Sequence, residues 1–261
     1  MIMKPAADEN WWMSIFDDVY LQTDARSVCD DQLTYDEVSF LESGLNISKH
    51  WQILDLCGGQ GRHALELSRR GFFNITVFDY SGYLLSNGKK NADRENLAVT
   101  FVRGDARYIG LQDGGFDFIM LMGSSFGYFI HEGENRKILA ESFRLLTSQG
   151  TILLDLPDKN HVIKNFKPRA CHRANDQLEI IRDRKLEKGV IYCRERVINA
   201  SNNCIRDNVY STRLYSQQQI QGILQDVGFH DVRFKTDFMR RDKLGDYGCM
   251  TNRMIVLASK G

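Results

Sequence analysis

The stretch Ile53-Leu54-Asp55-Leu56-Cys57-Gly58-Gly59-Gln60-Gly61-Arg62 decides the fold of this chain. An apolar run that contains one acid ends at three glycines, and a helical pattern over residues 62–70 follows it. Glycines let the backbone turn sharply and approach a bound molecule with no side chain in the way. The order predicts a strand over residues 51–56, a tight loop, and a helix that Gly71 ends.

Two further acids follow strand-like runs. Asp79 ends the apolar run 75–78, about twenty residues past the glycines, where nucleotide-binding folds place the acid that binds both ribose hydroxyls. The run 99–102 leads into Asp105, a third carboxylate at a strand end, where a base amine could donate to it. The three acids therefore predict a cofactor that contains a nucleoside.

The negative charge of Asp55 helps to distinguish between the candidate cofactors. Residues 59–64 fit the dinucleotide pattern G-x-G-x-x-A, which favours a pyrophosphate at the helix N-terminus. Asp55 argues against a pyrophosphate, because a carboxylate beside the loop repels phosphate and attracts an ammonium group. S-adenosylmethionine has an ammonium, a ribose diol and an adenine amine but no phosphate. These groups suit Asp55, Asp79 and Asp105.

At these residues the sequence resembles the class I S-adenosylmethionine-dependent methyltransferases. Residues 54–63, Asp79, 104–106 and 115–119 match the family in order, and later segments at 143–150 and 227–229 continue the match. One departure is Cys57, which stands where the family's first loop glycine is usual. The resemblance implies S-adenosylmethionine as cofactor and S-adenosylhomocysteine as product. The cofactor-binding residues predicted on this basis are Asp55, Cys57, Gly58, Gly59, Gly61, Arg62, Asp79, Tyr80, Gly104, Asp105, Ala106, Gly123 and Ser124.

The rest of the pattern predicts the fold class. Strands and helices alternate up to residue 156, which is typical of an α/β, Rossmann-like parallel sheet with helices on both faces. Residues 157–213 change to short period-2 runs, which predict three or four antiparallel strands inserted after strand five. Helical and strand patterns then return. We expect one methyltransferase domain over residues 1–156 and 214–261, with a small β-rich insertion at 157–213.

Candidate acceptor-binding residues lie outside this alternating core. Aromatic and aliphatic residues recur at helical spacing over residues 8–20, which predicts either a core-packing helix or a lid within residues 1–33 that covers the cofactor. In the second interpretation Trp11 and Tyr20 form part of the acceptor wall. The insertion is likewise open to two interpretations, a solvated meander or a lid over the acceptor pocket.

The loop after strand four, residues 122–131, combines glycines, serines and aromatics. Loops at strand ends carry function disproportionately, so Tyr128 and His131 are the candidate catalytic residues. Tyr128 could equally be a packing residue, and a lone histidine is usually solvated or hydrogen-bonded. Arg213 joins Trp11, Tyr20 and Tyr128 as a candidate substrate-binding residue. No residue is identified as a general base.

Two local patterns receive structural interpretations. Thr34 and Glu37 form a capping-box pattern, which predicts a helix from there to about Gly44. The segment 155–158 has the order Asp-Leu-Pro-Asp after strand five, and we interpret it as a loop turn.

Composition bounds the remaining functions. The chain has 261 residues, 43% of them hydrophobic, and a formal net charge of zero, which argues against a nucleic-acid substrate. Its six cysteines show no CxxC pair or disulfide framework, and the N-terminus lacks a signal segment, so we expect a cytoplasmic protein with free thiols. No apolar run is long enough for a membrane span, and no His and Cys spacing suggests a metal. We expect a monomer or homodimer.

The sequence predicts a methyltransferase of a small molecule, with the methylated atom (N, O or C) undetermined. Three alternatives stay open. The first is an NAD-dependent oxidoreductase, and the second is an aminopropyl-type transferase that uses decarboxylated S-adenosylmethionine. The third is a methyltransferase-like subunit that binds a cofactor or a protein partner without turnover.

Overall fold

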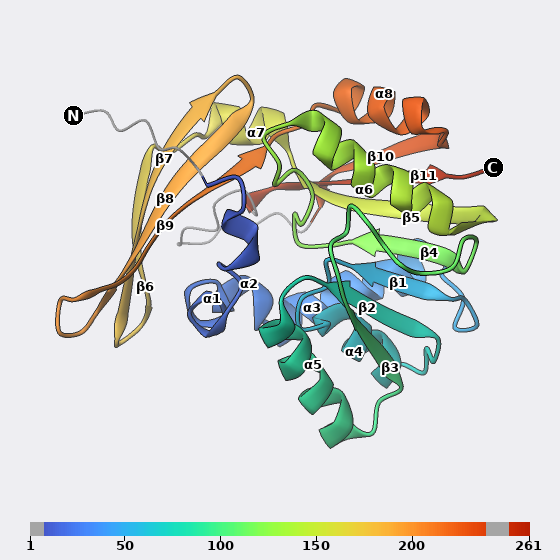
Figure 1. Cartoon of the computed structure of the whole chain (residues 1–261), viewed down its shortest axis with the longest axis horizontal. Coiled ribbons are helices and arrows are strands. Elements are labelled where there is room, and N and C mark those ends of the chain that lie inside the picture. Colours follow the sequence, from blue (N-terminus) through green and yellow to red (C-terminus); the bar gives the residue numbers. More distant parts are fainter. Residues whose placement is uncertain (1–7, 239–250) are drawn as a thin grey trace.

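The computed structural model describes residues 8–238 and 251–261, which form two separate sheets flanked by helices (Figure 1). The larger sheet has seven strands in the order β10-β11-β5-β4-β1-β2-β3. Strands β3, β2, β1, β4 and β5 run parallel, and β11 lies antiparallel between β5 and β10. The strands of this sheet are β1 (Ile53–Leu56), β2 (Ile75–Asp79), β3 (Val99–Arg103), β4 (Phe116–Leu121), β5 (Leu146–Pro157), β10 (His230–Phe238) and β11 (Arg253–Ser259).

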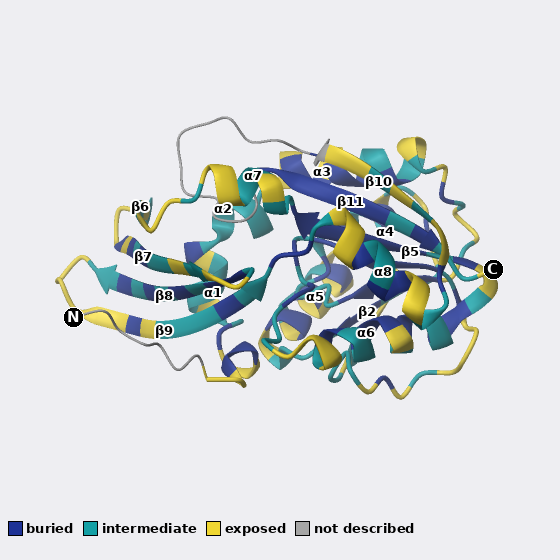
Figure 2. Ribbon diagram, turned by 90° about the horizontal axis from the view of Figure 1, so that it is seen from above, coloured by how far each residue is buried: buried dark blue, intermediate teal, exposed yellow. Residues whose placement is uncertain are grey.

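Apolar side chains alternate between the two faces of the central strands, so helices cover both faces. Ile119 and Leu121 of β4 pack with α6 and α8, whereas Phe118 and Met120 pack on the opposite face with α3 and α4. The central strands are accordingly the most deeply buried part of the chain (Figure 2). The helices are η1 (Trp11–Met13), α1 (Asp18–Thr23), α2 (Ala25–Val28), α3 (Asp31–Ser39), the π-helical turn η2 (Phe40–Gly44), α4 (Arg62–Arg69), α5 (Gly82–Glu95), α6 (Glu132–Leu145), α7 (Lys159–Lys164) and α8 (Gln217–Val227).

The strand order creates a switch point beside β1. The chain moves from β1 outward to β2 and β3 and then returns to β4 on the other side of β1. The connections that leave the carboxyl ends of β1 and β4 therefore diverge, which opens a crevice at that edge of the sheet. In this architecture ligands bind in that crevice.

The second sheet confirms the predicted antiparallel insertion after strand five. Its four strands are β6 (Arg169–Asn175), β7 (Leu178–Glu187), β8 (Val190–Asn199) and β9 (Cys204–Arg213), in sequence order. In Figure 1 this sheet stands at the left, and α1 and α2 lie between it and the larger sheet. The N-terminal segment therefore fills the space between the two sheets.

Three local expectations were wrong. The aromatic stretch at residues 8–20 is not one helix, because η1 ends at Met13 and α1 begins only at Asp18, capped by Asp17. The helix assigned to the capping box at Thr34 begins earlier, at Asp31, because the side chain of Asp30 accepts the Leu33 amide and caps it. Asp155 belongs to β5 rather than to a loop turn, and its side chain is fully buried.

Candidate cofactor and acceptor site

The glycine loop brings backbone, rather than side chains, to the carboxyl end of β1. Cys57, Gly59 and Gly61 have φ angles of 57°, 58° and 70°, in the left-handed region. Gly58 packs on Asp55 so closely that an added Cβ would lie 2.6 Å from the carboxyl carbon. The Gly61 amide donates to the Gly58 carbonyl at 2.8 Å and closes the turn before α4. Cys57 thus adopts a glycine-like conformation, which costs other residues about 1 kcal/mol.

Asp55 lies on β1, directly before the glycine loop. Its side chain is fully buried and lines the cavity described below, and neither carboxylate oxygen makes a hydrogen bond of good geometry with the described residues. Burial raises the pKa of Asp55 to about 7, and the opposing effects of Arg62 and of the Ala64 amide do not cancel the rise. A buried carboxylate without a partner is costly, so the site fits a ligand that brings an ammonium group.

Asp79 links the glycine loop to the start of α5. Its two carboxylate oxygens accept the amides of Gly59 and Ser81, each at 2.8 Å. Burial raises the pKa of Asp79, although these amides oppose the rise. Each carboxylate oxygen can accept about two hydrogen bonds, so both oxygens keep capacity for a ligand.

Asp105 is paired within the protein. The guanidinium of Arg107 donates to it at 2.6 Å and also binds Glu134 at 2.6 Å. Burial acts to raise the pKa of Asp105, but the Arg107 contacts outweigh it and lower this pKa. A ligand amine would therefore share this carboxylate with Arg107.

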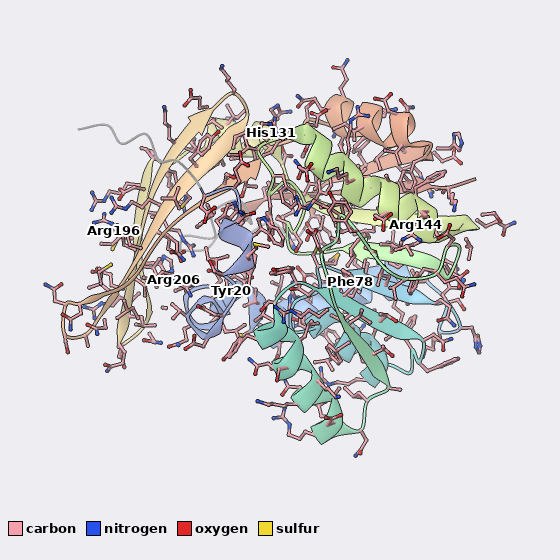
Figure 3. The ribbon with its side chains drawn as sticks, viewed as in Figure 1. Tyr20, Phe78, His131, Arg144, Arg196 and Arg206 are labelled. Atoms are coloured by element: carbon pink, nitrogen blue, oxygen red, sulfur yellow. The ribbon has the colours of Figure 1, made fainter. Side chains whose placement is uncertain are left out.

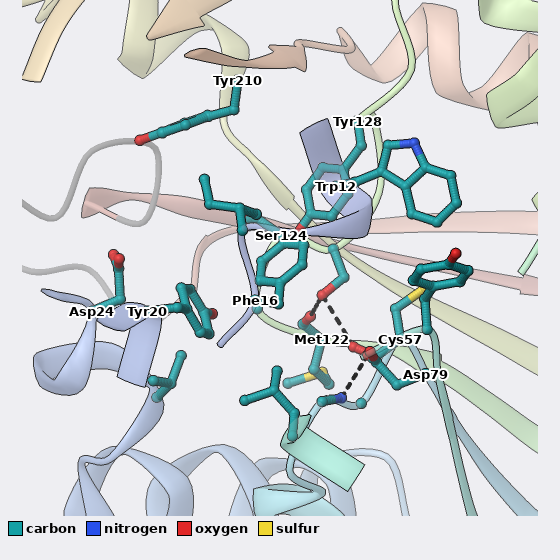
Figure 4. Close-up of a pocket in the computed structure, with 18 of the residues that line it drawn as sticks. Trp12, Phe16, Tyr20, Asp24, Cys57, Asp79, Met122, Ser124, Tyr128 and Tyr210 are labelled. Carbon is teal, nitrogen blue, oxygen red and sulfur yellow. Dashed lines mark hydrogen bonds between the residues drawn. The ribbon is translucent and has the colours of Figure 1, made fainter. Parts of the chain in front are cut away.

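A cavity of about 270 Å³ lies over the carboxyl ends of β1, β2 and β4 and continues to the inner face of the small sheet (Figure 4). Gly61 is outside the lining, because it supports the loop from behind; an added Cβ would lie 2.9 Å from Val77 and 3.1 Å from Phe101. The other predicted cofactor residues all line the cavity: Asp55, Cys57, Gly58, Gly59, Arg62, Asp79, Tyr80, Gly104, Asp105, Ala106, Gly123 and Ser124.

Aromatic rings form the opposite wall. Trp11, Tyr20 and Tyr128, all predicted for the acceptor side, line the cavity together with Phe16 and Tyr210. The ring centroids of Trp11 lie 5.0 Å from Tyr128 and 5.6 Å from Tyr210, and those of Phe16 and Tyr20 are 5.0 Å apart. Burial raises the pKa of Tyr128, so its hydroxyl is a hydrogen-bond donor rather than a base at neutral pH.

Two predicted residues do not reach the cavity lining. His131 is the N-cap of α6, its side chain is 76% exposed, and it faces Glu9 at 3.6 Å (Figure 3). The guanidinium of Arg213 donates to the Ile130 carbonyl, while its backbone amide donates to Gly127 at 2.7 Å. Arg213 thus links β9 to the loop after β4, and it does not line the cavity.

One face of the small sheet also lines the cavity, and sequence reasoning missed its charged residues. Arg182 on β7 stands directly opposite Glu195 on β8, and both are buried. The Arg182 guanidinium donates to Glu195 at 2.8 Å and to both carboxylate oxygens of Asp24, at 3.0 and 2.9 Å. The period-2 alternation of these strands could have indicated one common face. The residues of the face that line the cavity are Arg182, Arg184, Ile191, Cys193, Glu195, Tyr210 and Thr212.

A second buried charge network was also missed. The fully buried Arg253 of β11 bridges Glu37 of α3 and Asp155 of β5, at 2.5 Å from the latter. Glu37 in turn binds Arg62 at 2.5 Å, and Asp155 accepts the Gly123 amide at 2.8 Å. Burial acts to raise the pKa of Glu37, but its cationic neighbours lower it. Through Arg62 and the Gly123 amide, this network contacts the glycine loop and the loop after β4.

Two further findings concern the described ranges, 8–238 and 251–261. No three His, Cys, Asp or Glu side chains there are grouped to hold a metal ion. None of the helices in these ranges has the length and apolar character required to span a membrane.

Parts of this chain resemble known proteins in sequence. Residues 53–150 match a sequence profile described as a methyltransferase domain. The glycine/sarcosine N-methyltransferase of Parasynechococcus marenigrum (strain WH8102) is 22% identical over 191 residues, which cover 72% of this chain. The match spans 66% of that relative's own length.

Solved structures agree in fold. An S-adenosylmethionine-dependent methyltransferase from Clostridium acetobutylicum ATCC 824 superposes with a TM-score of 0.73 at 17% identity, covering 93% of this chain and 96% of that chain. An amino pentose methyltransferase from Micromonospora echinaspora, solved with S-adenosylmethionine bound, has a TM-score of 0.65 at 14% identity, covering 87% and 90%. Residues 53–150 are thus a methyltransferase domain, and the chain as a whole has the fold of S-adenosylmethionine-dependent methyltransferases.

Proposed function

We propose that this protein transfers the methyl group of S-adenosylmethionine, in line, to a small-molecule acceptor. One observation carries the proposal: a single cavity joins the glycine loop and Asp79 to an aromatic wall and to the inner face of the small sheet. A cofactor at the strand ends and an acceptor against the rings would share this enclosed space. The neutral net charge of the chain supports a small acceptor over a polyanion.

Each acid at the strand ends is assigned to one polar group of the cofactor. In our proposal Asp55, buried and without a partner among the described residues, holds the ammonium group. Asp79 holds the ribose diol with the acceptor capacity left by Gly59 and Ser81. Asp105, held by Arg107, is assigned to the adenine amine. Arg62 supports the loop through its ion pair with Glu37.

The protein's other task is to enclose the reaction. When bound, the cofactor supplies a methyl group that its positive sulfur has already activated, so the chain must mainly orient the acceptor and exclude water. Trp11 and Trp12 are each 7% exposed and cover the cavity from the N-terminal segment. Tyr128 lies in the wall, where its hydroxyl can donate to an acceptor. A cytoplasmic location is also proposed, and the free thiols of Cys29, Cys57, Cys171, Cys193 and Cys204 support it.

Calorimetry tests the cofactor assignment. S-adenosylmethionine and S-adenosylhomocysteine should both bind with micromolar-range affinity, and NADH should not. Tight NADH binding with no response to S-adenosylhomocysteine would overturn the proposal in favour of an oxidoreductase.

A turnover assay distinguishes a methyltransferase from a non-catalytic subunit that only binds the cofactor. S-adenosylhomocysteine should be released when the protein is incubated with S-adenosylmethionine and a panel of small amines, phenols and carbon acids. Tyr128→Phe should lower turnover of any acceptor found and leave S-adenosylhomocysteine affinity near that of the wild type. A variant that loses both equally, or neither, would place Tyr128 among the packing residues.

A further inference from the structure

The acceptor end of the cavity holds two acids around one guanidinium. Arg182 binds Asp24 and Glu195 at the same time, so two carboxylates share one guanidinium. Glu195 is 2% exposed, and both acids line the cavity. Figure 4 places Asp24 on the side of the close-up opposite Asp79, so this acid lies away from the proposed ribose site.

Aromatic rings surround the same end. Tyr20, Tyr128 and Tyr210 all line the cavity. Burial raises the pKa of each of these tyrosines, and the negative charge of Asp24 raises each one further. Aromatic faces and carboxylates both attract cations, and together they select a positively charged nitrogen.

Two other guanidiniums lie near this group, and each has interactions of its own. Arg206 of β9 binds Asp17 and donates to the Ile15 carbonyl at 3.3 Å. Arg184, which lines the cavity, also has interactions within the protein. Arg182 is thus the guanidinium that Asp24 and Glu195 share.

We infer that the Asp24, Glu195 and aromatic end of the cavity binds a protonated amine carried by the acceptor, whose apolar body lies against the rings of Trp11, Phe16 and Tyr128. This inference rests on the proposed function and names the substrate class of that site. Asp24 and Glu195 are the specificity-determining residues, and Arg182 positions both.

Three probes of one shape test the inference: benzylamine, which is protonated at neutral pH, benzyl alcohol, which is neutral, and benzoate, which is an anion. Ligand-observed NMR titrations on the protein saturated with S-adenosylhomocysteine give their relative affinities. Benzylamine should bind at least about fivefold more tightly than benzyl alcohol, and benzoate most weakly. Equal affinities, or a preference for benzoate, would overturn the inference.

Variants test which residues cause the preference for benzylamine over benzyl alcohol. Asp24→Asn and Glu195→Gln should each reduce the preference for benzylamine to below about twofold. Asp207→Asn is the matched control, because Asp207 lies in the same sheet and pairs with Arg194 but does not line the cavity. A preference that survives both cavity variants would also refute the inference.

Two readouts keep the interpretation unambiguous. Circular dichroism and S-adenosylhomocysteine affinity establish that each variant is folded, and the wild-type comparison of three probes stands without any variant. A wild type that fails to bind S-adenosylhomocysteine refutes the proposed function. A wild type that binds it but shows no preference for benzylamine refutes only the inference about the acceptor.

Discussion

Replacing Asp55 by asparagine should stabilise the protein without cofactor at neutral to alkaline pH and weaken its hold on the cofactor. Burial raises the pKa of this side chain from 3.8 to about 7. Since the folded pKa lies above the unfolded one, the folded protein keeps a proton that the unfolded chain has released. Stability therefore falls as the pH rises from about 4 to about 7, and the loss is complete above that window.

The size of the effect follows from the two pKa values. A tenfold change in proton affinity corresponds to about 1.4 kcal/mol, so the penalty is about 2 kcal/mol near pH 5 and about 4 kcal/mol near pH 8. Asparagine does not titrate. Between these two pH values the free energy of unfolding of the wild type should therefore fall by about 2 to 3 kcal/mol more than that of Asp55→Asn. The buried amide has its own desolvation cost, about 1 to 3 kcal/mol, but that cost does not change with pH.

Urea denaturation of both proteins near each of these pH values measures the difference, and calorimetry measures S-adenosylhomocysteine affinity. The variant should bind at least about tenfold more weakly, because it loses a charge-assisted contact to the ammonium group. Asp105→Asn is the control of opposite sign: Arg107 lowers the pKa of Asp105, so this variant should lose stability at neutral pH. Parallel pH profiles for wild type and Asp55→Asn would refute the burial argument, and unchanged S-adenosylhomocysteine affinity would refute the ammonium role.

Three further predictions concern the same loops. Arg253→Met should reduce the free energy of unfolding by about 3 to 5 kcal/mol, because Glu37 and Asp155 would stay buried without their shared cation. The control Arg194→Met breaks the partly exposed ion pair with Asp207 and should reduce it by less than about 1 kcal/mol. Equal losses for the two variants in urea denaturation would contradict this reasoning. Asp79→Asn should weaken S-adenosylhomocysteine by at least about tenfold by calorimetry, and an unchanged affinity in a folded variant would remove Asp79 from the ribose site. Cys57→Gly should raise the free energy of unfolding by up to about 1 kcal/mol by releasing a left-handed backbone, and a clear loss of stability would mean that the thiol's packing matters more than the strain.

The cofactor end of the site could be predicted because its residues follow directly from local sequence. A strand, a glycine loop and a helix start within residues 53–62 fix where Asp55 and the loop backbone lie. Parallel pairing then brings Asp79, one strand along, to the same edge of the sheet. The same local reasoning failed for residues 8–20, because helical spacing of aromatics does not show that Asp17 starts a new helix and interrupts the pattern.

The buried ion networks could not be predicted, because their partners lie far apart in the sequence. Arg253 meets Glu37 across 216 positions and Asp155 across 98. A charged residue within an apolar run does not indicate which opposite charge it will contact. The partner that offsets the cost of burying this charge comes close only in the folded chain. His131 illustrates a different difficulty: a polar residue in a strand-end loop, predicted as catalytic, is a helix N-cap with an exposed ring and does not line the cavity.

The proposed acceptor end of the cavity is also formed by contacts between residues that lie far apart in the sequence. Arg206 of β9 binds Asp17 and donates to the Ile15 carbonyl at 3.3 Å, and Arg182 of β7 binds Asp24, so two buried guanidiniums hold the N-terminal segment against the small sheet. Neither contact involves the glycine loop, Asp55 or Asp79. Substitutions on this face can therefore reshape the acceptor end while the strand-end carboxylates keep their positions. Because Asp55, Asp79 and Asp105 are positioned by β1, β2 and β3 of the larger sheet, we expect that acceptor specificity can change without rebuilding the cofactor site.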